Sequence, residues 1–203
     1  MTTTISRLYN NYGDARTAVR QLEAAGVSHN DISILASNAE NWYNDGKDTY
    51  PDRDLDGKDD RAEGARTGAG LGATAGGAAG LLAGLGLMAI PGVGPVVAAG
   101  WLVSTLAGAA AGAATGGAIG ALTQAGVSGD DAPVYAEAIR RGGAVVSARV
   151  SDNDATRLQA LMDRSAVRVA DQATAYRQSG WKTFDPNAAP YSRDQVIKER
   201  TRV

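Results

Sequence analysis

Residues 64–120 read GARTGAGLGATAGGAAGLLAGLGLMAIPGVGPVVAAGWLVSTLAGAAAGAATGGAIG, and this segment has the strongest pattern in the chain. From Thr67 onward it belongs to a longer run, residues 67–129, that contains no Asp, Glu, Lys or Arg. A soluble surface segment of that length normally carries charges of both signs. The run therefore predicts a segment that packs against itself, in an oligomer or in lipid.

Small residues recur at every fourth position in both halves of this stretch. The two series are Gly64, Gly68, Gly72, Gly76, Gly80 and Gly84, and then Gly100, Ser104, Gly108, Gly112, Gly116 and Gly120. Each member of the first series pairs with one of the second so that the two numbers sum to 184. Positions of constant sum lie opposite each other in an antiparallel hairpin, and the midpoint is Gly92 in a PGVGP turn. Because glycines at this spacing let two helices approach closely, the pattern predicts a glycine-zippered antiparallel helical hairpin.

The hairpin has the length of a membrane-spanning helix pair. Its arms, residues 64–90 and 96–122, would each extend about 40 Å as a helix, against about 30 Å for the core of a bilayer. Arginines flank the stretch at 61, 66, 140 and 141, and the turn carries no charge. This pattern favours an inner (cytoplasmic) membrane with the folded part of the chain in the cytoplasm. Two alternatives stay open: a flexible glycine/alanine linker, and a soluble cytoplasmic hairpin buried in an oligomer.

The segments that flank the stretch predict one α+β domain. Strands are expected at residues 3–9, 31–37, 144–150 and 166–170, and helices at 14–25, 132–141 and 154–164. Neither half buries enough apolar surface to be stable alone. Together they predict a ferredoxin-like sandwich, β-α-β followed by α-β-α-β, with helices on one face of the sheet. The divisions are 1–40 and 125–175 for the two halves, 41–63 for an acidic loop, 64–124 for the hairpin and 176–203 for a flexible tail with a short final helix.

The acidic loop matches the calcium-binding pattern D-x-D-x-D-G-x5-E. The candidate metal ligands are Asp52, Asp54, Asp56, Asp60 and Glu63. Carboxylates at alternate positions can wrap a Ca²⁺ ion, and Gly57 permits the tight turn between them. Pro51 argues against a full EF-hand because it prevents a continuous preceding helix, and Asp59 stands where an apolar residue is usual. The alternative is a solvated acidic linker whose last carboxylates favour the start of the next helix.

Composition excludes several other kinds of site. The chain has no cysteine, which excludes disulfides, thiolate metal sites and cysteine nucleophiles. Its one histidine, His29, excludes a multi-histidine metal centre, and the net charge of −2 offers no basic field for nucleic acid. The glycine-rich segments lack the context of a Walker or Rossmann motif. We therefore expect a protein that is not an enzyme, with no small-molecule substrate and no cofactor other than Ca²⁺.

Four segments carry a resemblance to a known family. They are TTTISRLYNNYGDARTAVRQLEAAGVSHNDISILAS from residue 2, AIPGVGPVVAAGW from residue 89, DDAPVYAEAIRRGGAVVSARV from residue 130 and GWKTFDPNAAPY from residue 180. The chain resembles the bacterial heat-induced general stress protein family (YflT-like). The resemblance implies stress-linked expression and a membrane-associated or oligomeric protein, and it supplies no catalytic residues.

Two functional hypotheses follow from the sequence. The first is a non-enzymatic protein of the stress response that is anchored in membrane lipid by the hairpin. Its cytoplasmic α+β domain then binds a partner or self-associates as a homo-oligomer. The alternative is a soluble homo-oligomeric or filament-forming structural protein whose hairpins pack in the core of the assembly.

Overall fold

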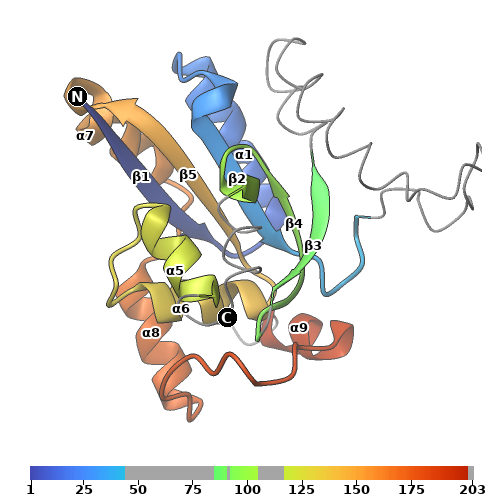
Figure 1. Ribbon diagram of the computed structural model, residues 1–203. Coiled ribbons are helices and arrows are strands. Elements are labelled where there is room, and N and C mark those ends of the chain that lie inside the picture. The colour runs from blue at the N-terminus through green and yellow to red at the C-terminus, as the bar shows by residue number, and fades with distance from the viewer. Residues whose placement is uncertain (44–84, 91, 105–116, 201–203) are drawn as a thin grey trace, which may run out of the picture.

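The computed structural model describes residues 1–43, 85–90, 92–104 and 117–200. Their strands form one antiparallel sheet in the order β1-β5-β2-β4-β3 (Figure 1). The strands are β1 (Thr2–Tyr9), β2 (Ile32–Ser37), β3 (Gly86–Ile90), β4 (Gly94–Ala99) and β5 (Ala144–Ser151). β1 and β2 both pair with β5, so β5 lies between the two strands of the first β-α-β unit. The predicted α+β class is confirmed.

Helices cover both faces of this sheet. The described residues contain α1 (Tyr12–Ala24), the 3-10 turn η1 (His29–Asp31), α5 (Gly117–Gln124), α6 (Ala132–Arg140), α7 (Asp152–Met162), α8 (Val169–Gln178) and α9 (Arg193–Arg200). α1 and α7 pack on one face, and α6 packs on the other together with α5 and α8 (Figure 1). The prediction of helices on one face only is therefore wrong.

The reason lies in the two central strands. Every residue of β2 is buried, and so are the first five residues of β5. Within β5, Val145 belongs to the apolar cluster under α6, and the next residue, Val146, belongs to the cluster under α1 and α7. Successive side chains of a strand point to opposite faces of the sheet. A strand that is apolar at both odd and even positions therefore needs elements packed on both faces.

Local signals place the helices of both halves close to their predicted ranges. Asn11 precedes α1, and its side-chain oxygen accepts a hydrogen bond from the backbone N–H of Asp14 at 3.0 Å. Gly26 follows the helix with a φ of 94°, which is the left-handed conformation of a glycine stop. Ser151 caps α7 in the same way through the N–H of Asp154, at 3.2 Å.

The predicted strand at residues 166–170 is reduced to one bridge. Val167 pairs with Leu8 of β1, and its N–H donates to the Leu8 carbonyl at 2.7 Å. α8 then begins at Val169, so the second half of the predicted strand is helical. The alternation in AVRVA is too short to outweigh the helix-forming residues that follow it, ADQATAYRQ.

The centre of the uncharged stretch is a β-hairpin, where the sequence analysis predicted the ends of two helices. β3 and β4 pair from Gly86↔Ala98 to Ile90↔Gly94, and the two numbers of every pair sum to 184. Gly92, with a φ of 74°, lies in the turn. The predicted axis of symmetry is therefore confirmed, but the predicted helices are wrong here. β4 also pairs with β2, so the hairpin extends the sheet by two strands.

Three of the predicted zipper positions fall in the described residues. Gly100 follows β4 with a φ of 85°, and a side chain there would collide with the Ile32 carbonyl of β2. Ser104 is helical and is the last described residue of its range, and Gly120 lies in α5, which packs into the core beside α6. The remaining zipper positions lie outside the described residues: Gly64, Gly68, Gly72, Gly76, Gly80, Gly84, Gly108, Gly112 and Gly116. In the part of the chain that the structure describes, no helix is both long and apolar enough to cross a membrane.

The C-terminal segment, predicted as a flexible tail, packs on the domain. Phe184 is 8% exposed and Val196 is fully buried. Pro186 lies against Gly92 and Pro190 against Gly94, so the segment holds the turn between β3 and β4. The predicted final helix is α9.

Candidate functional site

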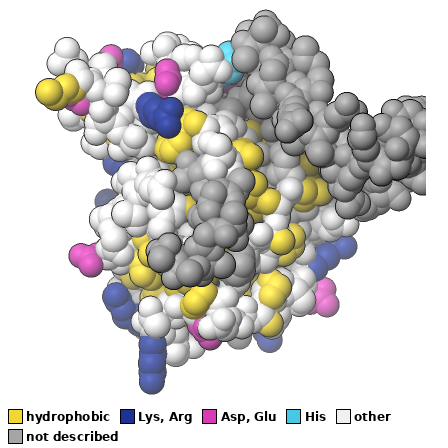
Figure 2. Space-filling view, viewed as in Figure 1, with side chains coloured by type: hydrophobic (Ala, Val, Ile, Leu, Met, Phe, Trp, Pro, Cys, Tyr) yellow, Lys and Arg dark blue, Asp and Glu magenta, His cyan; other side chains and the backbone are white. Residues whose placement is uncertain are grey.

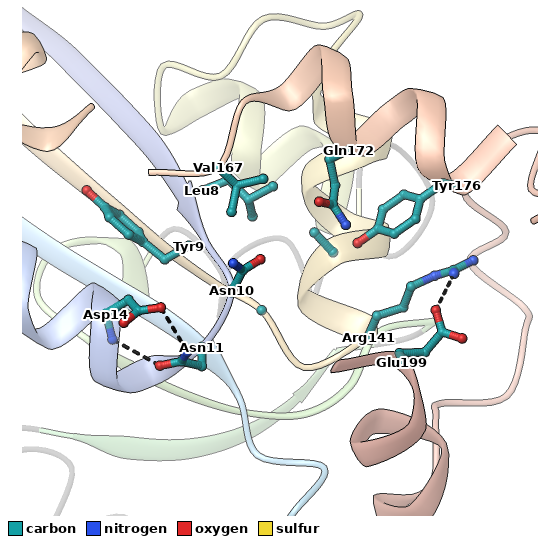
Figure 3. A pocket seen from close by; sticks show the side chains of 12 residues that line it. Leu8, Tyr9, Asn10, Asn11, Asp14, Arg141, Val167, Gln172, Tyr176 and Glu199 are labelled. Atoms are coloured by element: carbon teal, nitrogen blue, oxygen red, sulfur yellow. Dashed lines mark hydrogen bonds and ion pairs between the residues drawn. The ribbon is translucent and has the colours of Figure 1, made fainter. Parts of the chain in front are cut away.

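A pocket of about 370 Å³ opens at the end of β1, where the chain turns into α1 (Figure 3). The end of α6 and the two last helices, α8 and α9, complete its wall. Its polar lining comes from Asn10, Asn11, Asp14, Arg141, Gln172, Tyr176 and Glu199. Figure 3 shows the side chains of Asn10, Gln172 and Tyr176 directed toward one shared space, while the Tyr9 ring points away from it.

A cluster of two arginines and two glutamates adjoins this pocket, and two of its members, Arg141 and Glu199, line the pocket wall. Glu137 of α6 is fully buried, and its Oε1 accepts hydrogen bonds from Arg141 Nε at 2.6 Å and Arg140 Nη2 at 2.9 Å. Arg141 Nη1 also donates to Glu199 of α9 at 2.7 Å. A buried carboxylate is tolerated when it is paired and hydrogen-bonded in this way. The cluster balances its own charges and joins α6 to α9.

Burial and pairing set the protonation states on this side of the pocket. Burial disfavours the charged guanidinium of Arg141, but its hydrogen bond to Glu137 and the charge of that carboxylate raise its pKa above the ordinary value. The Arg141 guanidinium carbon lies 4.3 Å from the centre of the Tyr176 ring. Burial raises the pKa of Tyr176 to about 12, so the phenol stays protonated at neutral pH.

The described lining of the pocket combines side-chain amides and a neutral phenol with the carboxylates of Asp14 and Glu199 and the guanidinium of Arg141. Arg141 and Glu199 are paired with each other, so the amides and the phenol are the groups left to a ligand. The carboxylate of Asp14 accepts a hydrogen bond from the Asn11 amide at 2.8 Å, so part of its hydrogen-bonding capacity is already used. This set of groups suits an uncharged polar molecule or a peptide amide.

A second candidate site is the junction from which residues 44–84 leave the domain. The side chain of Asn38 donates to the Tyr43 carbonyl and accepts from the Tyr43 N–H, both at 3.0 Å. Its backbone N–H donates to Pro95 of β4 at 2.8 Å, which fixes this turn to the sheet. The Tyr43 hydroxyl donates to the Leu85 carbonyl at 2.9 Å. The two described residues that flank 44–84 are therefore in direct contact.

Aromatic side chains surround this junction. The Trp42 and Tyr12 rings stack with their centres 4.1 Å apart, and the Tyr43 ring meets Trp42 edge-on at 5.9 Å. Trp42 keeps 36% of its surface exposed, although its Nε1–H donates to the Ser37 carbonyl at 2.7 Å. The junction thus presents an aromatic surface to solvent.

The predicted calcium ligands lie outside the described residues. These are Asp52, Asp54, Asp56, Asp60 and Glu63. Within the ranges that the structure describes, no group of three or more His, Asp or Glu side chains is placed to hold a metal ion. His29 lies in η1, in the connection between α1 and β2 where the sequence placed it.

The arginines at 140 and 141 have a different role from the predicted one. The sequence analysis placed them as charges that flank a membrane segment. Their side chains are only 11% and 9% exposed, and both bind the buried Glu137. The spacing of Glu137, Arg140 and Arg141 is the signal that sequence reasoning missed, because i,i+3 and i,i+4 pairs face each other on a helix.

Comparison with known proteins adds no name to these sites. The chain matches no protein-family model, no curated protein and no solved structure.

Proposed function

We propose that this chain is a non-enzymatic, stress-associated protein that attaches to a membrane surface through residues 44–84. The observation that carries the proposal is the hydrogen bond between Tyr43 and Leu85, which brings both ends of this segment to one place on the domain. The last 18 residues of the segment, 67–84, carry no charge. The stress association rests on the resemblance of four sequence segments.

Chain length supports a shallow attachment. A segment that starts and ends on the same side of a bilayer crosses it an even number of times, and each crossing needs about 20 apolar residues. The 18 uncharged residues before Leu85 are too few for two crossings. After β4, α5 already packs into the core through Ala118, Ala121 and Leu122, so it belongs to the domain. Insertion into one leaflet fits these lengths better than a spanning helix pair.

The domain itself is best interpreted as a ferredoxin-like core with an added hairpin. β1, β5 and β2 stand in the order of the first, third and second strands of that fold, with α1 and α7 on one face. Val167, bridged to Leu8, takes the place of the fourth strand. On this interpretation, β3 and β4 extend the sheet on the side of β2 and carry the junction.

The alternative function is a soluble homo-oligomer. Among the described residues β3 pairs only with β4, so its outer edge can accept a strand, and Leu87 on it is 40% exposed. Figure 2 shows hydrophobic side chains over the middle of this face of the molecule and charged side chains toward its periphery. Such a patch is typical of a surface that binds another protein.

Flotation with lipid vesicles separates the two functions. The test variant replaces residues 44–84 by a short Gly/Ser linker, which can close because Tyr43 and Leu85 are in contact. We expect the full chain to float with the vesicles and the variant to stay in the soluble fraction with an unchanged circular dichroism spectrum. A full chain that does not float and runs as a large soluble particle would favour the alternative.

A further inference from the structure

We propose that Tyr12, Arg16, Arg20 and Trp42 form a platform by which the folded domain contacts anionic lipid headgroups. The inference rests on the membrane attachment proposed above, and it names the surface of the domain that faces the lipid. The proposed partner is a bilayer surface that contains anionic lipid. The experiment also detects the alternative, in which the same surface contacts a second copy of the chain.

The first step is that the fold holds Trp42 in an exposed position. Asn41 adopts a φ of 53°, a left-handed conformation that asparagine tolerates better than most residues, and its N–H donates to the Asn38 carbonyl at 2.8 Å. Asn38 brackets the same turn with two side-chain hydrogen bonds to Tyr43. The turn therefore fixes the tryptophan ring by several specific contacts without burying it.

The second step is the chemistry of the exposed ring. The indole N–H is already bonded to the Ser37 carbonyl, and Tyr12 is stacked on the ring at 4.1 Å. The indole donor is therefore used within the protein, and the surface left to a partner is aromatic. Tryptophan and tyrosine rings are enriched at the level of lipid headgroups because each joins an apolar body to a polar group.

The third step is a row of positive charge beside the ring. Tyr12, Arg16 and Arg20 follow each other at four-residue intervals along α1, so they lie along one side of the helix. The Arg16 guanidinium carbon lies 6.0 Å from the centre of the Tyr12 ring, and Arg20 Nη2 donates to Thr17 at 3.3 Å. Both arginines are exposed, and neither forms an ion pair with an acidic residue of the described chain. Their charges are therefore available to phosphate groups.

The platform also lies beside the ends of the segment proposed to reach the membrane. Trp42 stands two residues before the point at which the chain leaves the described domain, and Tyr43 joins that point to Leu85. A membrane reached by the uncharged residues that precede Leu85 therefore lies close to the platform. Aromatic rings at the headgroup level and arginines near phosphates would then act together with the attached segment.

The experiment compares full-length variants on two kinds of vesicle. One contains phosphatidylcholine alone, and the other contains phosphatidylcholine with phosphatidylglycerol. Each exposed arginine near an anionic surface contributes about a fivefold gain in partitioning, so the double variant Arg16→Gln/Arg20→Gln should bind the anionic vesicles about 25-fold more weakly. The matched control is Arg168→Gln/Arg177→Gln, which removes the same charge from the region of α8 on the other face of the sheet and should bind like the unmodified chain.

The aromatic half of the platform has its own variants. Trp42→Ala should weaken binding to both kinds of vesicle about tenfold, because it removes the apolar surface that would be buried at the interface. Trp42→Phe keeps a ring that can stack on Tyr12 and should recover most of the loss. Circular dichroism of each variant shows whether the domain is still folded.

Three results would overturn the proposal, and they differ in what else they affect. If the unmodified chain binds neither kind of vesicle, both the platform and the proposed membrane attachment fail. If the unmodified chain binds but the arginine variant and its control bind the anionic vesicles equally strongly, the platform alone fails. If light scattering shows a dimer that dissociates in Trp42→Ala, the platform is a contact between copies of the chain.

Discussion

The β1–β5–β2 part of the sheet and the β3–β4 hairpin are held in place by different parts of the chain. The first is covered by α1 and α7 on one face and by α6 on the other. The hairpin is joined to the sheet by the pairing of β4 with β2, and its turn rests on Pro186 and Pro190 of the C-terminal segment. We therefore expect the hairpin to loosen without unfolding the rest of the sheet, and the junction that starts residues 44–84 lies beside it.

The largest effect is expected at the buried carboxylate under α6. Glu137→Ala leaves Arg140 and Arg141 without their shared partner, and removing one member of a buried ion pair costs about 3–5 kcal/mol. The free energy of unfolding in urea should fall by that amount. Hydrogen exchange should accelerate in β1, β2 and β5 together, because α6 packs directly on the central strands.

Two controls show whether charge is the cause. Glu137→Gln keeps an oxygen that can accept from the two arginines and should lose less stability than the alanine variant. Glu199→Ala removes a carboxylate that is 21% exposed and should lose less still, because solvent can replace it. Equal losses for all three variants would assign the effect to packing alone.

A smaller effect is expected in the turn of the hairpin. Gly94 has a φ of 105°, and a side chain there would collide with Pro190. Gly94→Ala should therefore cost about 1–3 kcal/mol through backbone strain and loss of the tail contact. Hydrogen exchange should accelerate in β3 and β4 and should stay slow in β1 and β5.

Gly26→Ala is the matched control for this variant. Gly26 has a similar φ of 94°, but a side chain there would meet open space. It should cost only the strain of the left-handed backbone, about 1 kcal/mol. If Gly94→Ala accelerates exchange equally in every strand, the hairpin and the rest of the sheet form one cooperative unit, and the comparison fails.

The same comparison explains how far the sequence could predict the fold. Outside residues 166–170, the apolar spacing in the flanking halves matches the element that forms, and side-chain caps at Asn11 and Ser151 mark the helix starts. The spacing of small residues in the central stretch is compatible with more than one type of element. A helical hairpin and a β-hairpin both pair positions of constant sum, so the value 184 identified the axis at Gly92 without identifying the element. The edge of β2 that β5 leaves unpaired favours strands in the central stretch. The local sequence pattern of that stretch carries no information about this edge.

The candidate site was predictable only in part, for a similar reason. Glu137 lies on a helix with apolar neighbours, and its spacing from Arg141 shows that the two side chains can meet. What buries the pair is the packing of α6 against both the sheet and α8, together with α9, whose Glu199 binds Arg141. Contacts between elements that are distant in sequence leave no periodic signal. The stack of Trp42 on Tyr12 was missed for the same reason, because 30 positions separate the two residues.

The smallest effect is expected from calcium, and it bears on the hairpin side alone. If residues 52–63 bind Ca²⁺, the ion is held by a segment whose flanking residues, Tyr43 and Leu85, are in contact directly before β3. For an affinity near that of weak loops, calcium at a few times the dissociation constant stabilises the bound state by about 1 kcal/mol. Isothermal calorimetry on the full chain should show one site, which Asp54→Ala or Glu63→Ala abolishes. Hydrogen exchange should slow in β3 with calcium, while β1 and β5 stay unchanged.

Asp130→Ala, outside the loop, is the control and should bind like the unmodified chain. No heat at millimolar calcium, with no change in exchange at β3, would return residues 52–63 to a solvated acidic linker. Slower exchange in all strands would instead show that the two parts of the sheet respond as one.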